Sequence, residues 1–359
     1  MKTLWVGILA VMGWSLVHAG PIDKGRHVQP APRIILPSMF SENMVLQRDV
    51  TIPVWGWAPD GTPITVTLAD RMASTVATNG YWHVRLPPLP AGGPYTFRVE
   101  SPGDYHYDTI LFSQVRAGDV WLVAGDISVM QAVADSAEAR QAIADSATNT
   151  TIRVFMAGYR PASSVSAAQE ILMGFWGRPK WEAASYTVPR SSRTDIPGGS
   201  SALGWYFARA LDRKLGQNVP LGIIELSSLL PIEAWLSPSD LAGDARTAGR
   251  SEGLPPAPGA RAFLANIAPL APFPIRGAVV SVHMGRQSPA QIILPALAKS
   301  WRAAWADESL PILFAQSPGL LTNEAAQISP CAIAEQLVIQ ALGVAYDGMN
   351  RVGGGKLSD

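Results

Sequence analysis

Hydrophobic and polar residues alternate along four short stretches in the first third of the chain. These stretches cover residues 52–54, 64–68, 82–86 and 95–99. Turn-forming residues separate them, most clearly at Asn79-Gly80. A period of two is typical of a strand with one buried face, so the pattern predicts a small sandwich-like β-domain over residues 34–110.

After residue 110 the apolar positions change from alternation to continuous runs and helical spacing. Buried strands are predicted at 120–124, 221–224, 278–282 and 311–315. Helices are predicted at 201–215, 294–305 and 333–346. Strands that alternate with helices indicate an α/β layer with a mainly parallel sheet. We assign this layer to residues 111–347 and a flexible, glycine-rich tail to residues 348–359.

The N-terminus has the pattern of a secretory signal peptide. Lys2 supplies a positive charge, residues 4–17 are apolar, and Ala19 lies at a plausible cleavage site. The alternative is a membrane anchor, although the apolar stretch is shorter than the ~20 residues that span a bilayer. We therefore predict a signal peptide at residues 1–19 and a proline-rich linker at residues 20–33. The mature protein is then secreted or periplasmic, without a membrane partner.

Charge and cysteine content narrow the range of partners and cofactors. Lys and Arg total 28, as do Asp and Glu, and like charges form no runs, so the sequence predicts no nucleic-acid partner. Cys331 is the only cysteine, which excludes an internal disulfide. The Cys and His spacing is not typical of a metal site, so we expect neither a metal nor another cofactor. The sequence does not set the oligomeric state.

Several ordered blocks of the chain carry a resemblance to a known family. The blocks are Leu36–Arg48, Pro53–Trp57, Gly118–Leu122, Pro231–Trp235 and Ile267–Gly277. Together with the stretch around residue 125, they resemble the carbohydrate (sialate-type) O-acetylesterases of the SGNH-hydrolase group. The resemblance implies an SGNH-hydrolase-like three-layer α/β domain with an accessory β-domain. It also implies that acetylated glycans are the partners to expect.

The nucleophile block of that family is altered in this chain. Where the family has Gly-Gln-Ser-Asn-Met, this chain has Gly125-Asp126-Ile127-Ser128-Val129-Met130, one residue longer. If Gly125 sets the register, Ile127 stands at the nucleophile position, and its alkyl side chain cannot attack an ester. If Met130 sets the register, Ser128 is the candidate nucleophile, and the inserted residue must bulge in a tight turn. A helix N-cap or turn serine is the alternative role for Ser128.

Three further blocks that resemble the catalytic elements of the family also differ. Ser227–Pro231 lacks the glycine pair of the oxyanion block, and Arg286 stands at the acidic position of the next block. Gln327-Ile328-Ser329-Pro330 aligns with Asp-Ile-His-Pro of the family, so Gln327 replaces the acid and Ser329 replaces the base. The segment near residues 317–326 is shorter than in the family, which predicts an internal truncation of the α/β domain.

These differences leave three hypotheses for the chain. The first is a secreted homologue that has lost esterase activity, with Ile127, Gln327 and Ser329 as degenerate positions, and that acts as a glycan-binding or interaction module. The second is an active serine ester hydrolase with Ser128 as the nucleophile. His283, the only histidine of the larger domain, is its candidate base, although a lone histidine at the end of a strand is more often a polar loop residue. The third is a decaying copy that folds poorly because of the truncation.

Three tryptophans are candidates for stacking on sugar rings, namely Trp121, Trp176 and Trp235. Apolar neighbours along the sequence make core packing the alternative role for Trp121 and Trp235.

Overall fold

A computed structural model gives the fold of most of the chain. It describes residues 34–101, 109–125, 139–156, 181–183, 201–228, 230–243, 259–282, 290–316 and 330–345. These residues belong to one compact unit, which starts at Arg33. The predicted signal peptide, the linker and the C-terminal tail lie outside the described residues.

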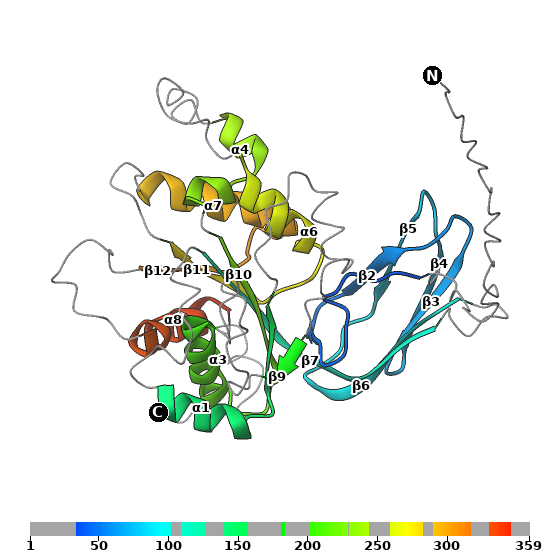
Figure 1. The fold of residues 1–359 in the computed structure, drawn as a ribbon, viewed down its shortest axis with the longest axis horizontal. Helices are drawn as coiled ribbons and strands as arrows, with labels where there is room; N and C mark the ends of the chain where they lie inside the picture. Colours follow the sequence, from blue (N-terminus) through cyan, green and yellow to red (C-terminus); the bar gives the residue numbers. More distant parts are fainter. Residues whose placement is uncertain are drawn as a thin grey trace, which may run out of the picture. The chain divides into compact units, whose positions relative to one another are not determined.

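The first described part of the chain is built from short, mostly antiparallel strands (Figure 1). They are β1 (Val45–Gln47), β2 (Ile52–Trp57), β3 (Pro63–Leu68), β4 (Arg71–Val76), β5 (Tyr81–Leu86) and β6 (Gly92–Glu100). β4, β3 and β6 form a sheet with the beginning of β7 (Thr109–Gly125), whereas β2 pairs with β5 in a separate two-stranded ribbon. All four alternating stretches of the sequence lie within strands. Asn79-Gly80 forms the predicted two-residue turn, because both residues have positive φ and Thr78 and Tyr81 exchange backbone hydrogen bonds.

A mainly parallel sheet forms the second part, as the sequence predicted. Its strands lie in the order β9 (Trp181–Ala183), β8 (Ile152–Met156), β10 (Leu221–Ser227), β7, β11 (Gly277–Val282) and β12 (Ile312–Gln316). All neighbours are parallel except β9, which runs antiparallel to β8.

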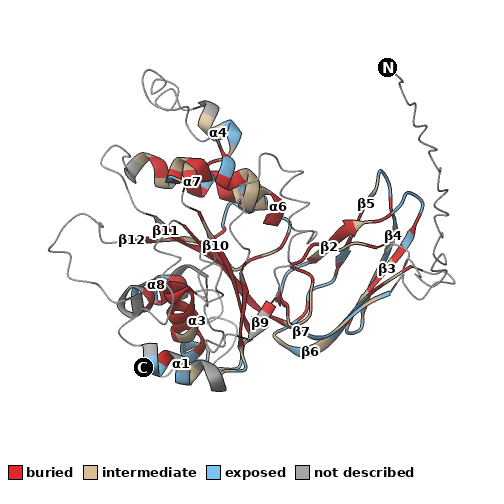
Figure 2. Cartoon of the chain, viewed as in Figure 1, coloured by how far each residue is buried: buried red, intermediate tan, exposed pale blue. Residues whose placement is uncertain are grey.

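Helices cover both faces of the parallel sheet (Figure 1). One face packs against α1 (Ala139–Thr148), α3 (Ala202–Lys214) and α8 (Pro330–Ala345). The other packs against α7 (Ala290–Trp305) and the short helices η4 (Ile232–Trp235), η5 (Phe263–Ile267) and α6 (Ala268–Leu270), with α4 (Pro238–Gly243) beside them. Trp121 and Val123 of β7 face α3 and α8, while Leu122 and Ala124 face α7. The result is the three-layer α/β fold that the family resemblance implied, with its buried residues in the sheet and on the inner helix faces (Figure 2).

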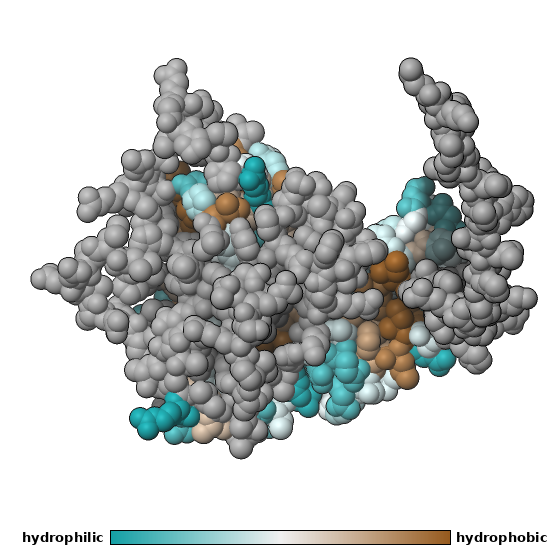
Figure 3. Space-filling model, in the orientation of Figure 1, coloured by the Kyte–Doolittle hydropathy of each residue, from teal (hydrophilic) through white to brown (hydrophobic). Residues whose placement is uncertain are grey.

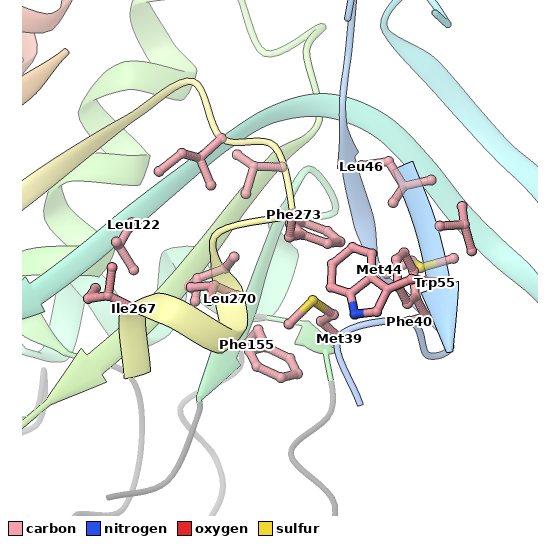
Figure 4. Packing of buried hydrophobic residues seen from close by; sticks show 14 of the residues in the cluster. Met39, Phe40, Met44, Leu46, Trp55, Leu122, Phe155, Ile267, Leu270 and Phe273 are labelled. Atoms are coloured by element: carbon pink, nitrogen blue, oxygen red, sulfur yellow. The ribbon is translucent and has the colours of Figure 1, made fainter. Parts of the chain in front are cut away.

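Strand β7 is shared by the two parts of the fold. Its first half pairs with β6, and its second half, from Asp119 to Gly125, pairs with β10. The predicted domain boundary between residues 110 and 111 therefore falls inside a continuous strand of 17 residues. Aromatic and methionine side chains from the N-terminal part pack directly against the segment before β11, with the ring centroids of Phe40 and Phe273 5.7 Å apart (Figure 4).

A buried ion pair joins Arg48, the residue after β1, to the middle of this shared strand. The carboxylate of Asp119 is fully buried and accepts hydrogen bonds from Arg48 Nε at 2.8 Å and Nη2 at 3.1 Å. The neighbouring Gln47 accepts from the backbone N–H of Val120 at 2.9 Å. These contacts fix the position at which β7 passes from one sheet to the other.

Among the described helices, every one is too short or too polar to cross a membrane.

Candidate active site at the carboxyl edge of the sheet

The carboxyl ends of the five parallel strands meet at one edge of the sheet. After β7 the chain continues to β8 on one side, and after β10 it continues to β11 on the other side of β7. Such a reversal of strand order is a topological switch point, and open α/β sheets bind ligands outside the strand ends at that point. The candidate site therefore lies beyond Gly125 of β7 and Ser227 of β10, which are register partners.

Backbone groups at this edge bond to one another. The N–H of Ser228 donates to the carbonyl oxygen of Gly125 at 2.9 Å, and the N–H of Leu230 donates to Ser228 Oγ at 3.1 Å. Ser228 itself is buried. Two N–H groups of the Ser227–Pro231 block are therefore occupied within the chain. An oxyanion hole needs N–H groups directed at the ester oxygen instead.

A buried carboxyl group lies just beneath the edge, and the sequence analysis missed it. Glu225 of β10 faces α3, and its two oxygens accept from the backbone N–H of Ser201 at 3.0 and 3.1 Å. Ser201 caps α3 by accepting from the N–H of Gly204 at 3.1 Å. A Cβ at Gly204 would lie 2.5 Å from Glu225 Oε1, so a side chain at this position would displace the buried carboxyl group.

Burial raises the pKa of Glu225 to about 8, and the hydrogen bond from Ser201 only partly opposes this shift. The carboxyl group therefore holds a proton at neutral pH. An acidic residue inside the apolar run 221–226 is the sequence feature that indicates this buried carboxyl group. The strand prediction did not use that feature.

The catalytic candidates themselves, Ile127, Ser128, His283, Gln327 and Ser329, all lie outside the described residues. The strands that precede two of them are described. Gly125, three residues before Ser128, is the register partner of Ser281, two residues before His283. The segments that carry these two candidates therefore leave the sheet from adjacent strands. Gln327 and Ser329 directly precede α8, whose first residue is Pro330.

Comparison with known proteins agrees with this fold. The chain matches no protein-family model. It is 26% identical to rat sialate O-acetylesterase over 209 residues and 27% identical to the human protein over 214 residues, in each case over 56% of this chain. A solved carbohydrate acetylesterase from Xanthomonas citri superposes with a TM-score of 0.69 at 25% identity, covering 88% of this chain and 76% of that one. The chain is therefore similar to the sialate O-acetylesterases and to a carbohydrate acetylesterase. Its match spans 37% of the rat protein and 38% of the human protein.

Two of the tryptophans proposed for sugar stacking are core residues in this chain. Trp121 is fully buried and packs edge-on against Phe207, with ring centroids 5.0 Å apart. Trp235 is 1% exposed, packs against Trp301, and accepts at its carbonyl oxygen a hydrogen bond from Trp301 Nε1 at 3.0 Å. Their alternative role in the core is therefore confirmed, and neither presents a surface to a sugar. Trp176 lies outside the described residues.

Metal-ligating side chains do not gather in the described part of the chain, where no group of three His, Cys, Asp or Glu residues has the geometry to hold an ion. Cys331 lies in the first turn of α8.

Proposed function

We propose that this chain is a secreted member of the sialate O-acetylesterase family that has lost esterase activity and acts as a glycan-binding or interaction module. The observation that carries the proposal is the hydrogen bond from the N–H of Ser228 to Gly125, together with that from Leu230 to Ser228. These bonds occupy N–H groups in the segment that provides oxyanion donors in active relatives. Removal of one such donor costs about 2.7–4 kcal/mol of transition-state stabilisation.

The sequence supports the same proposal at three other positions. Ile127 has no nucleophilic atom, Gln327 has no charge to stabilise an imidazolium, and Ser329 is not a base at neutral pH. Acyl transfer needs the nucleophile, the base and the acid together, so changes at all of these positions act in the same direction.

The second candidate function is an active serine ester hydrolase with a rearranged site. It uses Ser128 as the nucleophile and His283 as the base. The register of β7 against β11, with Gly125 opposite Ser281, supports this alternative, because the segments that carry the two side chains start next to each other. Acetylated glycans would be its substrates.

Hydrolysis of 4-nitrophenyl acetate by the purified mature protein tests the two functions. We expect the parent protein, Ser128→Ala and His283→Ala to give the same background rate, since no activated nucleophile is present. If the parent hydrolyses the ester and Ser128→Ala does not, the proposed loss of activity is wrong and the alternative function is established. A single cooperative melting transition of the same sample excludes poor folding as the reason for inactivity.

Secretion is part of the proposal and has its own test. Mass spectrometry of the protein recovered from the periplasm or the medium should give a chain that begins at Gly20. Recovery of the full chain in the membrane fraction would indicate an anchor instead.

A further inference from the structure

Two arginine side chains meet at the amino edge of the parallel sheet, at the opposite end of the strands from the candidate active site. Arg116 lies in the middle of β7, before the part of this strand that pairs with β10, and Arg153 is the second residue of β8. Figure 3 shows hydrophilic residues on the described surface beside β6 and β7, at the lower edge of the view. Gly125, at the carboxyl end of β7, lies about 30 Å farther along the strand than Arg116. The arginine pair of Arg116 and Arg153 is therefore separate from the candidate active site.

Both guanidinium groups of the arginine pair donate to the same atom. Arg116 Nη1 donates to the carbonyl oxygen of Thr150 at 2.6 Å, and Arg153 Nη1 donates to that oxygen at 3.0 Å. Arg153 Nη1 also donates to the carbonyl oxygen of Ile152 at 3.1 Å. Two positive charges are thus held close together, and the atom that they share is a neutral acceptor.

Carboxylates do not compensate these two charges in the part of the chain that the structure describes. Neither guanidinium group forms an ion pair there. Asp212 of α3 accepts instead from Asn149 Nδ2 at 3.2 Å and from Thr151 Oγ1 at 3.0 Å. Asp119, farther along β7, is bound by Arg48 Nε at 2.8 Å. The corner between β7 and β8 therefore carries an excess of positive charge.

Burial makes this excess of charge unfavourable in the folded chain. Arg153 is only 9% exposed, and Arg116 is partly buried. The Nε atoms of both side chains are buried without an acceptor among the described residues, although buried polar groups usually have one. Desolvation, together with the charge of Arg116, lowers the pKa of Arg153. Thr150, in contrast, is exposed, so the corner is open to solvent on that side.

We propose that Arg116 and Arg153 bind a divalent tetrahedral oxyanion, of the phosphate or sulfate type, which enters beside Thr150. The charge of such an anion matches that of the two guanidinium groups. Their Nη2 atoms donate to no acceptor among the described residues, and a guanidinium fork is suited to paired contacts with phosphate oxygens. A monovalent carboxylate such as acetate would neutralise only one of the two charges. The site goes beyond the proposed function and does not depend on it.

Calorimetric titration of the mature protein with sodium phosphate at constant ionic strength tests this site. We expect the parent to bind phosphate, and acetate to bind at least about tenfold more weakly. Arg116→Gln and Arg153→Gln should each raise the Kd for phosphate by about tenfold or more, because each removes charged donors. The matched control is Arg98→Gln, since Arg98 is an exposed arginine of β6 that is already paired with Glu100 at 2.8 Å. Its Kd should equal that of the parent.

Thermal denaturation separates ligand binding from a purely structural role of the two arginines. Phosphate should raise the Tm of the parent above its value in sodium chloride of the same ionic strength, because the ligand binds the folded chain. Each Gln variant should lose this rise. Glycerol phosphate distinguishes the two sources of the anion. Binding as tight as that of phosphate indicates a phosphoryl group carried by a larger molecule, whereas weaker binding indicates the free ion.

The inference is overturned if phosphate neither binds to the parent nor raises its Tm. It is also overturned if both Gln variants bind phosphate as the parent does, since the arginines then have a structural role alone. Far-UV circular dichroism verifies that each variant is folded. If Arg153→Gln does not fold, Arg116→Gln decides the question, because Arg116 is the less buried of the two. The ester-hydrolysis assay is a separate readout, so failure of this site leaves the proposed function untouched.

Discussion

Asp119→Ala is expected to lower the free energy of unfolding by about 3–5 kcal/mol, because it removes one partner of a buried ion pair. The carboxylate of Asp119 is 0% exposed, and the side chain of Arg48 that binds it is 11% exposed. Without the carboxylate, the guanidinium keeps its desolvation cost and loses two hydrogen bonds, of 2.8 and 3.1 Å. Urea denaturation of the mature protein, followed by tryptophan fluorescence, gives the difference as a shift in midpoint.

Asp49→Ala is the matched control for this experiment. Asp49 binds the same arginine at 3.2 Å, but its side chain is 46% exposed, so its removal should cost no more than about 1 kcal/mol. Equal losses in the two variants would contradict the prediction. Such a result would show that burial of the carboxylate does not determine how much it contributes to the free energy of unfolding.

Stability is also expected to fall as the pH rises from about 4.5 to about 8, owing to Glu225. The ordinary pKa of its carboxyl group is 4.5, and burial raises it to about 8 in the folded chain. Below the lower value both states are protonated, and the full contribution to stability is present. Above pH 4.5 the unfolded chain releases this proton before the folded chain does. The contribution of Glu225 to stability is therefore lost as the pH rises through the pKa of the folded chain. The total change reaches up to about 5 kcal/mol, since each pKa unit corresponds to about 1.4 kcal/mol.

Glu225→Gln separates this effect from other titrations. The amide keeps an acceptor for the N–H of Ser201 but does not ionise. Burial also raises the pKa of Asp212, with the same sign, but that group is present in both proteins and cancels in the comparison. We expect the urea midpoint of the parent to decline between pH 5 and pH 8 more steeply than that of the variant. Parallel declines would show that Glu225 does not titrate in this range.

The fold was predictable wherever the sequence repeats a simple period. The runs at 120–124, 221–224 and 278–282 became β7, β10 and β11, because strands buried on both faces of a parallel sheet are apolar at every position. Of β7 the sequence predicts only residues 120–124, since the strand is partly exposed in its first half and uniformly apolar after Asp119. The spacing of apolar residues depends on which faces of a strand are buried. In β7 this burial changes halfway along the strand.

The buried polar contacts were not predictable, because they join residues that are far apart in the chain. Glu225 bonds to Ser201, 24 residues earlier, and Asp119 bonds to Arg48, 71 residues earlier. Composition and spacing carry no information on such pairs. The candidate catalytic residues came from resemblance alone, and of their surroundings the structure describes the ends of β7, β10 and β11 and the start of α8.

The shared strand also limits how this protein can be divided. A fragment that began at residue 111 would start inside β7 and would lack both β1 and Arg48, which follows β1 and pairs with Asp119. The α/β layer would then carry an unpaired buried carboxylate and an exposed strand end, so its expression alone should yield aggregates. Proteases should likewise fail to release two stable halves.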